Sequence, residues 1–191
     1  DRSWGVRPVG TSDQQPHGTG VVPGFFWQWT PLNFATRSVF FHVNADAKGN
    51  VWNTRAVIAP DGADAAALID AEGEMSAPLA VGTRWPDGGT LTIEGPDGDE
   101  TLTFEPLGRF QMRGLGYTSP KWGHGLWHGP IEVQREDFGL QQVNPATMDN
   151  YHVQLPCKVT SDRHGEGMGV FEQLIIGPYA PMGLEEFLDL G

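Results

Sequence analysis

Cysteine, long apolar runs and positive charge are all scarce in this sequence. Cys157 is the single cysteine among 191 residues, so neither an intrachain disulfide nor a zinc site built from several cysteines can form. No apolar run approaches the roughly 20 residues that a membrane-spanning helix needs, which predicts no transmembrane segment. Acidic residues outnumber basic ones by 24 to 12, and the net charge of −12 repels nucleic-acid phosphates and anionic lipids. We therefore expect no nucleic-acid partner.

The first residues, "DRSWGVRPVG", lack the basic-then-apolar pattern of a secretory signal. Together with the single cysteine, this predicts a cytoplasmic location. No phosphate-binding glycine loop, calcium loop or nucleophile elbow occurs, so we expect no cofactor.

Glycine and proline are abundant instead, with 26 and 15 residues, and this density of turn formers suits many short strands. Apolar and polar residues alternate along most of the chain, which indicates strands with one buried face. In residues 39–44, Val39, Phe41 and Val43 share one face while Phe40, His42 and Asn44 share the other. Hairpins are predicted at the turns "DAKGN" and "PDGD".

Further strands are predicted along most of the remaining chain. Their ranges are 25–32, 51–59, 88–95, 100–107, 108–117, 121–134, 150–161 and 167–177. Residues 64–75 fit a helix or a strand equally, and residues 183–191 suggest a helical turn. The fold class is therefore all-β, an antiparallel lipocalin-like β-barrel with few short helices, in a single domain over residues 1–191.

The segment "YTSPKWGHGLWHGPIE", residues 117–132, concentrates histidine, tryptophan and glycine. His124 and His128 have the spacing of a helical zinc pair, but the surrounding glycines and Pro130 disfavour a helix. On a strand the two histidines would lie about 13 Å apart, too far to share a metal ion. We therefore predict no metal site. Close packing against a neighbouring strand and contact with a ligand both remain open for this segment.

Two motifs resemble those of the AttH-like, lipocalin-related proteins, which include hydroxyneurosporene synthase, a carotenoid hydratase. The motifs are "DRSWGVR", residues 1–7, and "GYTSPKWGHGLWHG", residues 116–129, although Ser119 stands where a histidine is common. The resemblance implies that the chain is the second of two tandem barrels, with an N-terminal barrel or another copy as partner. It also implies a hydrophobic ligand such as a terpenoid, carotenoid, steroid or polyketide.

Three functions follow from these observations. The first is binding of a hydrophobic small molecule in a barrel cavity. The second is a hydratase or isomerase in the same cavity, because adding water to an alkene begins with proton donation. The third is a structural half-domain that packs against a partner barrel. Whether the chain is an enzyme is left open.

The candidate site residues combine polar tips with large apolar bodies. As catalytic candidates we take Asp1, Tyr117 and His124. As ligand-binding candidates we take Arg2, Trp4, Trp27, Trp29, His42, Trp122, Trp127, His128 and Glu172. Each has a structural alternative: the tryptophans suit a packed core, and Glu172, in an apolar strand, suits an ion pair with an arginine such as Arg113. Cys157 is expected to be an inert buried thiol.

Overall fold

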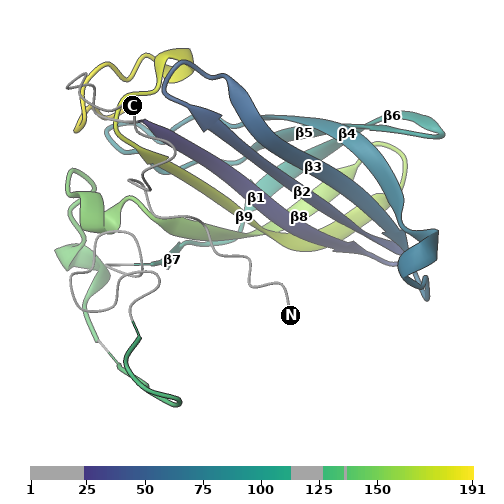
Figure 1. Cartoon of the computed structure of the whole chain (residues 1–191), viewed down its shortest axis with the longest axis horizontal. Helices are drawn as coiled ribbons and strands as arrows, with labels where there is room; N and C mark the ends of the chain where they lie inside the picture. The colour runs from purple at the N-terminus through teal and green to yellow at the C-terminus, as the bar shows by residue number, and fades with distance from the viewer. Residues whose placement is uncertain (1–23, 113–126, 136) are drawn as a thin grey trace.

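The computed structural model describes residues 24–112, 127–135 and 137–191. These residues form one antiparallel sheet of nine strands, labelled in Figure 1. The strands are β1 (Phe25–Phe34), β2 (Arg37–Asp46), β3 (Val51–Pro60), β4 (Ile69–Ser76), β5 (Gly89–Gly95), β6 (Gly98–Pro106), β7 (Phe110–Gln111), β8 (Val153–Ser161) and β9 (Gly165–Ile176). The sheet order is β6-β5-β4-β3-β2-β1-β9-β8-β7, and β6 also pairs with β8, which closes eight strands into a barrel.

The all-β barrel predicted from alternation and turn density is thus confirmed. The hairpin at "PDGD" is a tight one, because Gly95 pairs with Gly98 and only Pro96 and Asp97 lie between them. Gly98 has a φ of 99°, in the region that favours glycine. Every strand predicted within the described residues is present except the one over residues 121–134, whose described part, residues 127–134, contains no strand.

Helical structure in the described chain is limited to short 3₁₀ turns. They are η1 (Ala65–Ala67), η2 (Leu140–Gln142), η3 (Met148–Asn150) and η4 (Ala180–Met182). The ambiguous segment at residues 64–75 therefore divides into η1 and strand β4. The helical turn suggested for residues 183–191 is wrong, because those residues form bends and turns after η4. None of the helices described here is long and apolar enough to cross a membrane.

The barrel interior is filled by side chains from alternate strand positions. Buried inward residues include Phe26, Leu32, Val39, Phe41, Ile93, Leu102, Phe104, Leu155, Val159 and Phe171. Gly73 makes room for this packing, since a Cβ there would lie 2.8 Å from Cδ2 of Phe41. Two polar side chains that also point inward form hydrogen bonds: Gln28 donates to Gln173 at 2.8 Å, and Thr30 donates to the carbonyl of Val170 at 2.7 Å.

The C-terminal segment is held across one end of the barrel by Arg84, which lies in the β4–β5 connection. Its guanidinium has no exposed surface and lies 5.1 Å from the ring centre of Tyr151. Its hydrogen bonds go to the backbone carbonyls of Ile175, Gly177, Glu186, Phe187 and Asp189. The tight β1–β2, β5–β6 and β8–β9 turns lie at the opposite end of the barrel, on the right of Figure 1.

Candidate functional site

Four of the predicted site residues lie together on the outside of the barrel. Trp27 and Trp29 alternate with the inward-facing Phe26 and Gln28 of β1, so they share the outward face, as predicted. His42 and Glu172 face outward from the neighbouring strands β2 and β9. We call the side chains of Trp27, Trp29, Phe40, His42, Asn44 and Glu172 the outer wall.

Strand register sets the order of the outer wall. Trp29 is the Cα partner of His42 on one side and of Glu172 on the other. Adjacent strands are about 4.8 Å apart, so His42 and Glu172 are separated by about 10 Å with the indole of Trp29 between them. In the next outward row, Trp27 pairs with Asn44. A histidine and a carboxylate therefore flank a strip of aromatic rings.

Aromatic rings of the outer wall contact one another across β1 and β2. The rings of Trp27 and His42 have centroids 4.5 Å apart at 52°. Trp29 and Phe40 meet edge to face at 6.4 Å. Rings fixed in this way offer large, rigid apolar surfaces at a low loss of side-chain entropy.

Three polar atoms of the outer wall are buried without a hydrogen-bond partner among the described residues. They are Nε1 of Trp27, Nε2 of His42 and Nδ2 of Asn44. His42 is 6% exposed and Asn44 is 2% exposed. An unsatisfied buried polar atom costs about 1–3 kcal/mol, and native structures contain few of them. Three in adjacent positions of one sheet face single out this face, because none of them finds its partner among the described residues.

Burial lowers the pKa of the His42 imidazole, while a hydrogen bond to the Asn44 side chain acts in the opposite direction. The ring is therefore neutral at pH 7. Because the bond to Asn44 favours the protonated nitrogen, we assign the single N–H of the neutral ring to that bond. Nε2 then carries a lone pair and accepts hydrogen bonds, whereas the unpaired atoms of Trp27 and Asn44 are donors.

Glu172 is buried at 6% exposure and held at both carboxylate oxygens. His152 Nε2 lies 2.9 Å from Oε1, and Gln154 Nε2 donates to Oε2 at 2.7 Å. The expectation that this carboxylate needs a partner is therefore correct, but the described partners come from β8 and its preceding residue. The arginine suggested from the sequence, Arg113, lies outside the described residues.

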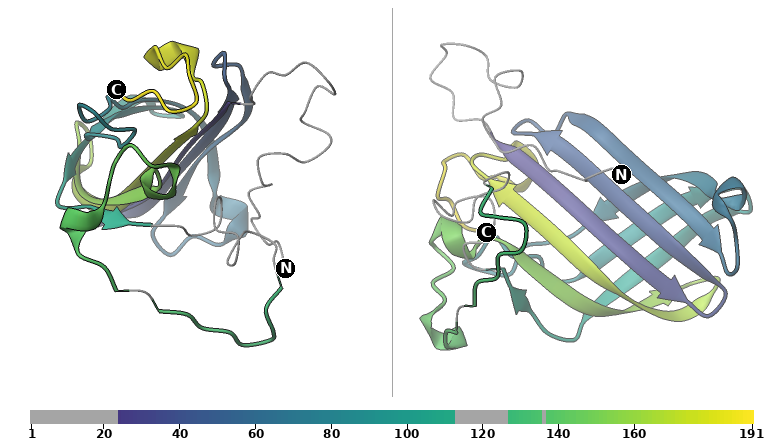
Figure 2. Two further views of the ribbon diagram at one scale, coloured as in Figure 1. Left: turned by 90° about the vertical axis from the view of Figure 1, so that its left-hand side faces the viewer. Right: turned by 60° about the horizontal axis from the view of Figure 1, so that its bottom comes forward.

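Two further predicted site residues, Trp127 and His128, lie away from the outer wall. Trp127 is 78% exposed, and His128 is exposed beside it. Both belong to an irregular segment that projects away from the barrel, the dark green trace of Figure 2. Asp1, Arg2, Trp4, Tyr117, Trp122 and His124 lie outside the described residues.

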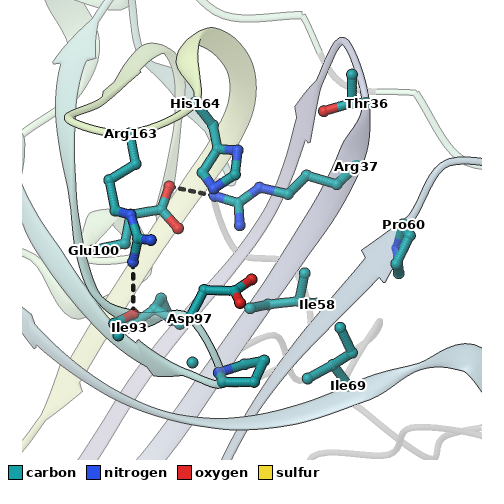
Figure 3. Close-up of a pocket in the computed structure, with 13 residues that line it drawn as sticks. Thr36, Arg37, Ile58, Pro60, Ile69, Ile93, Asp97, Glu100, Arg163 and His164 are labelled. Carbon is teal, nitrogen blue, oxygen red and sulfur yellow. Dashed lines mark hydrogen bonds and ion pairs between the residues drawn. The ribbon is translucent and has the colours of Figure 1, made fainter.

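A second feature, which sequence analysis missed, is a pocket of about 170 Å³ at the end of the barrel where the tight turns meet (Figure 3). Arg37 and Glu100 form an ion pair inside it, and Ser161 also donates to Glu100. The alternation that places Leu102 and Phe104 inward places Glu100 inward as well. A carboxylate at an inward strand position was the signal that could have revealed this site.

Among the described residues, no three potential metal ligands of the His, Cys, Asp or Glu type cluster, and the absence of a metal site stays a prediction. Comparison with protein-family models gives one match, to a family of unknown function, DUF8625, over residues 1–185. The chain belongs to this family. Neither the curated proteins nor the solved structures contain a match to it. Membership of DUF8625 therefore assigns no activity, and the likeness to AttH-like proteins stays a prediction.

Proposed function

We propose that this DUF8625 protein binds a hydrophobic small molecule with a flat or polyene body and one hydroxyl group, held against the outer wall. The supporting observation is a set of three buried polar atoms, on Trp27, His42 and Asn44, that lie among aromatic rings and have no hydrogen-bond partner among the described residues.

A hydroxyl group matches the polar atoms in number and kind. Its oxygen accepts from Trp27 Nε1 and Asn44 Nδ2, and its hydrogen is donated to His42 Nε2. The apolar body then lies over Trp29 and Phe40, whose rings meet edge to face. Terpenoid and steroid alcohols have this combination of one hydroxyl group and a large apolar surface.

The position differs from the barrel cavity expected from the sequence. Phe41, Phe104 and Phe171 pack in the described interior, with exposures of 1%, 4% and 0%. The outward face of the same strands instead combines rings with unpaired polar atoms. The proposal therefore places the ligand on the outside of β1, β2 and β9.

Titration with retinol tests the proposal. Retinol has one hydroxyl group on a flat polyene and absorbs where tryptophan emits, so binding at the outer wall should quench tryptophan emission saturably. His42→Phe keeps a ring but removes the acceptor, and we expect about tenfold weaker binding, as for one lost hydrogen bond in a buried site.

Two controls accompany that titration. Trp52→Phe removes a tryptophan that is 52% exposed on β3, and should leave the dissociation constant unchanged. Retinyl acetate cannot donate a hydrogen bond and should bind the wild type about as weakly as retinol binds the His42→Phe variant. Absence of saturable quenching, or equal retinol affinity in His42→Phe and wild type, would contradict the proposal.

Acid–base catalysis in the manner of a hydratase is the second candidate. It is favoured by the Glu172–His152 pair, in which a carboxylate orients an imidazole beside the aromatic strip. Incubation with geraniol in isotopically labelled water tests it by mass spectrometry. Label incorporation that Glu172→Gln abolishes, with retinol binding retained, is expected of the enzyme; no incorporation would leave ligand binding alone. The cytoplasmic location and the partner barrel stay predictions.

A further inference from the structure

The pocket at the end of the barrel where the tight turns meet has an apolar floor and a charged rim. Ile58, Ile69 and Ile93 line its floor, and the first and last of these are 6% and 1% exposed. Charged side chains from three different hairpins surround the floor: Arg37, Asp97, Glu100 and Arg163. An apolar base with a few convergent polar groups is typical of small-molecule sites.

The hydrogen bonds inside the pocket do not use all the N–H donors of Arg37. Glu100 is occupied by Arg37 Nη2 and by Ser161, whose Oγ in turn accepts from the backbone N–H groups of Arg163 and His164 at 3.0 and 2.7 Å. The Arg37 side chain is only 9% exposed, so its N–H groups need acceptors within the protein or in a ligand. Its Nε is buried and has no acceptor among the described residues. A guanidinium carries five N–H donors, so a further acceptor group is needed to satisfy it.

The rim adds one cation and one anion that are not paired with each other. Arg163 donates from Nη1 to the carbonyls of Gly98 and Asp99 at 3.0 and 3.3 Å, which holds its guanidinium over the pocket. The Asp97 carboxylate points into the pocket in Figure 3 and has no hydrogen bond or ion pair to any described residue. The free groups are thus arginine donors on one side and a carboxylate acceptor on the other.

From these features we infer that the pocket binds a small aliphatic zwitterion, an α-amino acid with a branched apolar side chain. Its carboxylate accepts from Arg37 and Arg163, and its ammonium donates to Asp97. The branched side chain covers the three isoleucines. The pocket volume of about 170 Å³ suits a molecule of leucine's bulk.

The site is separate from the outer wall. The pocket lies where β1 ends and β2 begins, and its charged groups face the barrel interior and its rim. Failure of retinol binding would therefore leave this inference standing, and failure of amino-acid binding would leave the outer-wall proposal standing.

Titration of the full chain with L-leucine, followed by nitrogen–proton NMR spectra, tests the inference. We expect saturable shifts of the amides of Gly95, Gly98 and His164, with a dissociation constant of about 1 mM or below, as a ligand of this size allows. Isovalerate lacks the ammonium, 3-methylbutylamine lacks the carboxylate, and L-serine lacks the apolar side chain. Each should bind at least about tenfold more weakly than leucine, since each loses one of three sets of contacts.

A matched pair of variants gives the decisive comparison. Asp97→Asn removes the carboxylate that faces the pocket, whereas Asp99→Asn removes one in the same hairpin that does not line it. Both residues are exposed, so neither change should alter the melting temperature. We expect about tenfold weaker leucine binding in Asp97→Asn, with isovalerate binding unchanged, and wild-type binding in Asp99→Asn. The inference is overturned if leucine produces no saturable shifts, or if the two variants bind it equally.

Discussion

Two arginines are buried at opposite ends of this barrel, and their surroundings differ. Arg84 has no exposed surface, and its three guanidinium nitrogens donate to five backbone carbonyls. Arg37 pairs with one carboxylate and lines a pocket, and its buried Nε has no acceptor in the described part of the chain. A guanidinium saturated by the protein's own backbone holds the fold together, whereas one with donors left over points to a ligand.

The largest expected effect on stability comes from removing the guanidinium of Arg84. Arg84→Met leaves five carbonyls without their donor and releases the C-terminal segment, so we expect a loss of about 3–5 kcal/mol in the free energy of unfolding. Urea denaturation followed by tryptophan emission measures it. Arg84→Lys retains the charge but not the planar fork, and should recover less than half of the loss. A loss below about 1 kcal/mol for Arg84→Met would show that the carbonyls find water instead.

A smaller loss is expected at the pocket end. Glu100→Gln leaves Arg37 without its counter-charge, but the pocket admits water, so we expect destabilisation of about 2 kcal/mol rather than the full penalty of a buried unpaired charge. Chemical denaturation of Arg37→Gln, of Glu100→Gln and of the double variant measures the coupling between the two side chains. The double variant should be more stable than Glu100→Gln. Equal stability would mean that Arg37 without its counter-charge costs no free energy of unfolding.

Cys157 reports on the interior between the two ends. Burial raises the pKa of its thiol to about 11 from an ordinary value of 9.0, while a hydrogen bond to the Phe171 backbone acts in the opposite direction. Because the unfolded thiol ionises first, the contribution of Cys157 to stability is present below pH 9 and is lost as the pH rises toward 11. Unfolding measured at pH 8 and pH 10.5 should show a smaller decrease for Cys157→Ala than for wild type. An identical decrease would show that the interior is wet at this position.

The smallest expected effect on stability is at Arg55, which neither holds the C-terminal segment nor lines the pocket. Arg55 lies 3.5 Å from Asp70, and the two side chains are 51% and 85% exposed. Surface pairs of this kind contribute about 0–1 kcal/mol, so Arg55→Ala should change the free energy of unfolding by less than about 0.5 kcal/mol. Thermal unfolding at low and high salt measures it. A loss comparable to that of Glu100→Gln would remove the distinction between buried and exposed arginines on which the comparison rests.

Part of the candidate site could be predicted from the amino-acid sequence. Alternation placed Trp27 and Trp29 on one face and His42 opposite Val43, and the structure confirms both assignments. Alternation cannot show which face of a strand points outward when both faces carry large apolar side chains. Trp27, Trp29 and His42 were therefore expected to line a cavity, whereas they lie on the outside of the barrel. Glu172 was recognised as a carboxylate that needs a partner, but its partners His152 and Gln154 are 18 or more residues away and are chosen by the register of β8 with β9.

The sequence by itself determined the all-β class, most of the strands and the tight turn at Pro96 and Asp97, because these depend on period-two patterning and local turn chemistry. Only the tertiary structure decided that β6 pairs with β8 to close the barrel. It also decided that Arg37 meets Glu100 across 63 residues and that Arg84 holds the C-terminal segment. Such contacts depend on which strands become neighbours, and that is a property of the whole sheet, which no window of sequence contains.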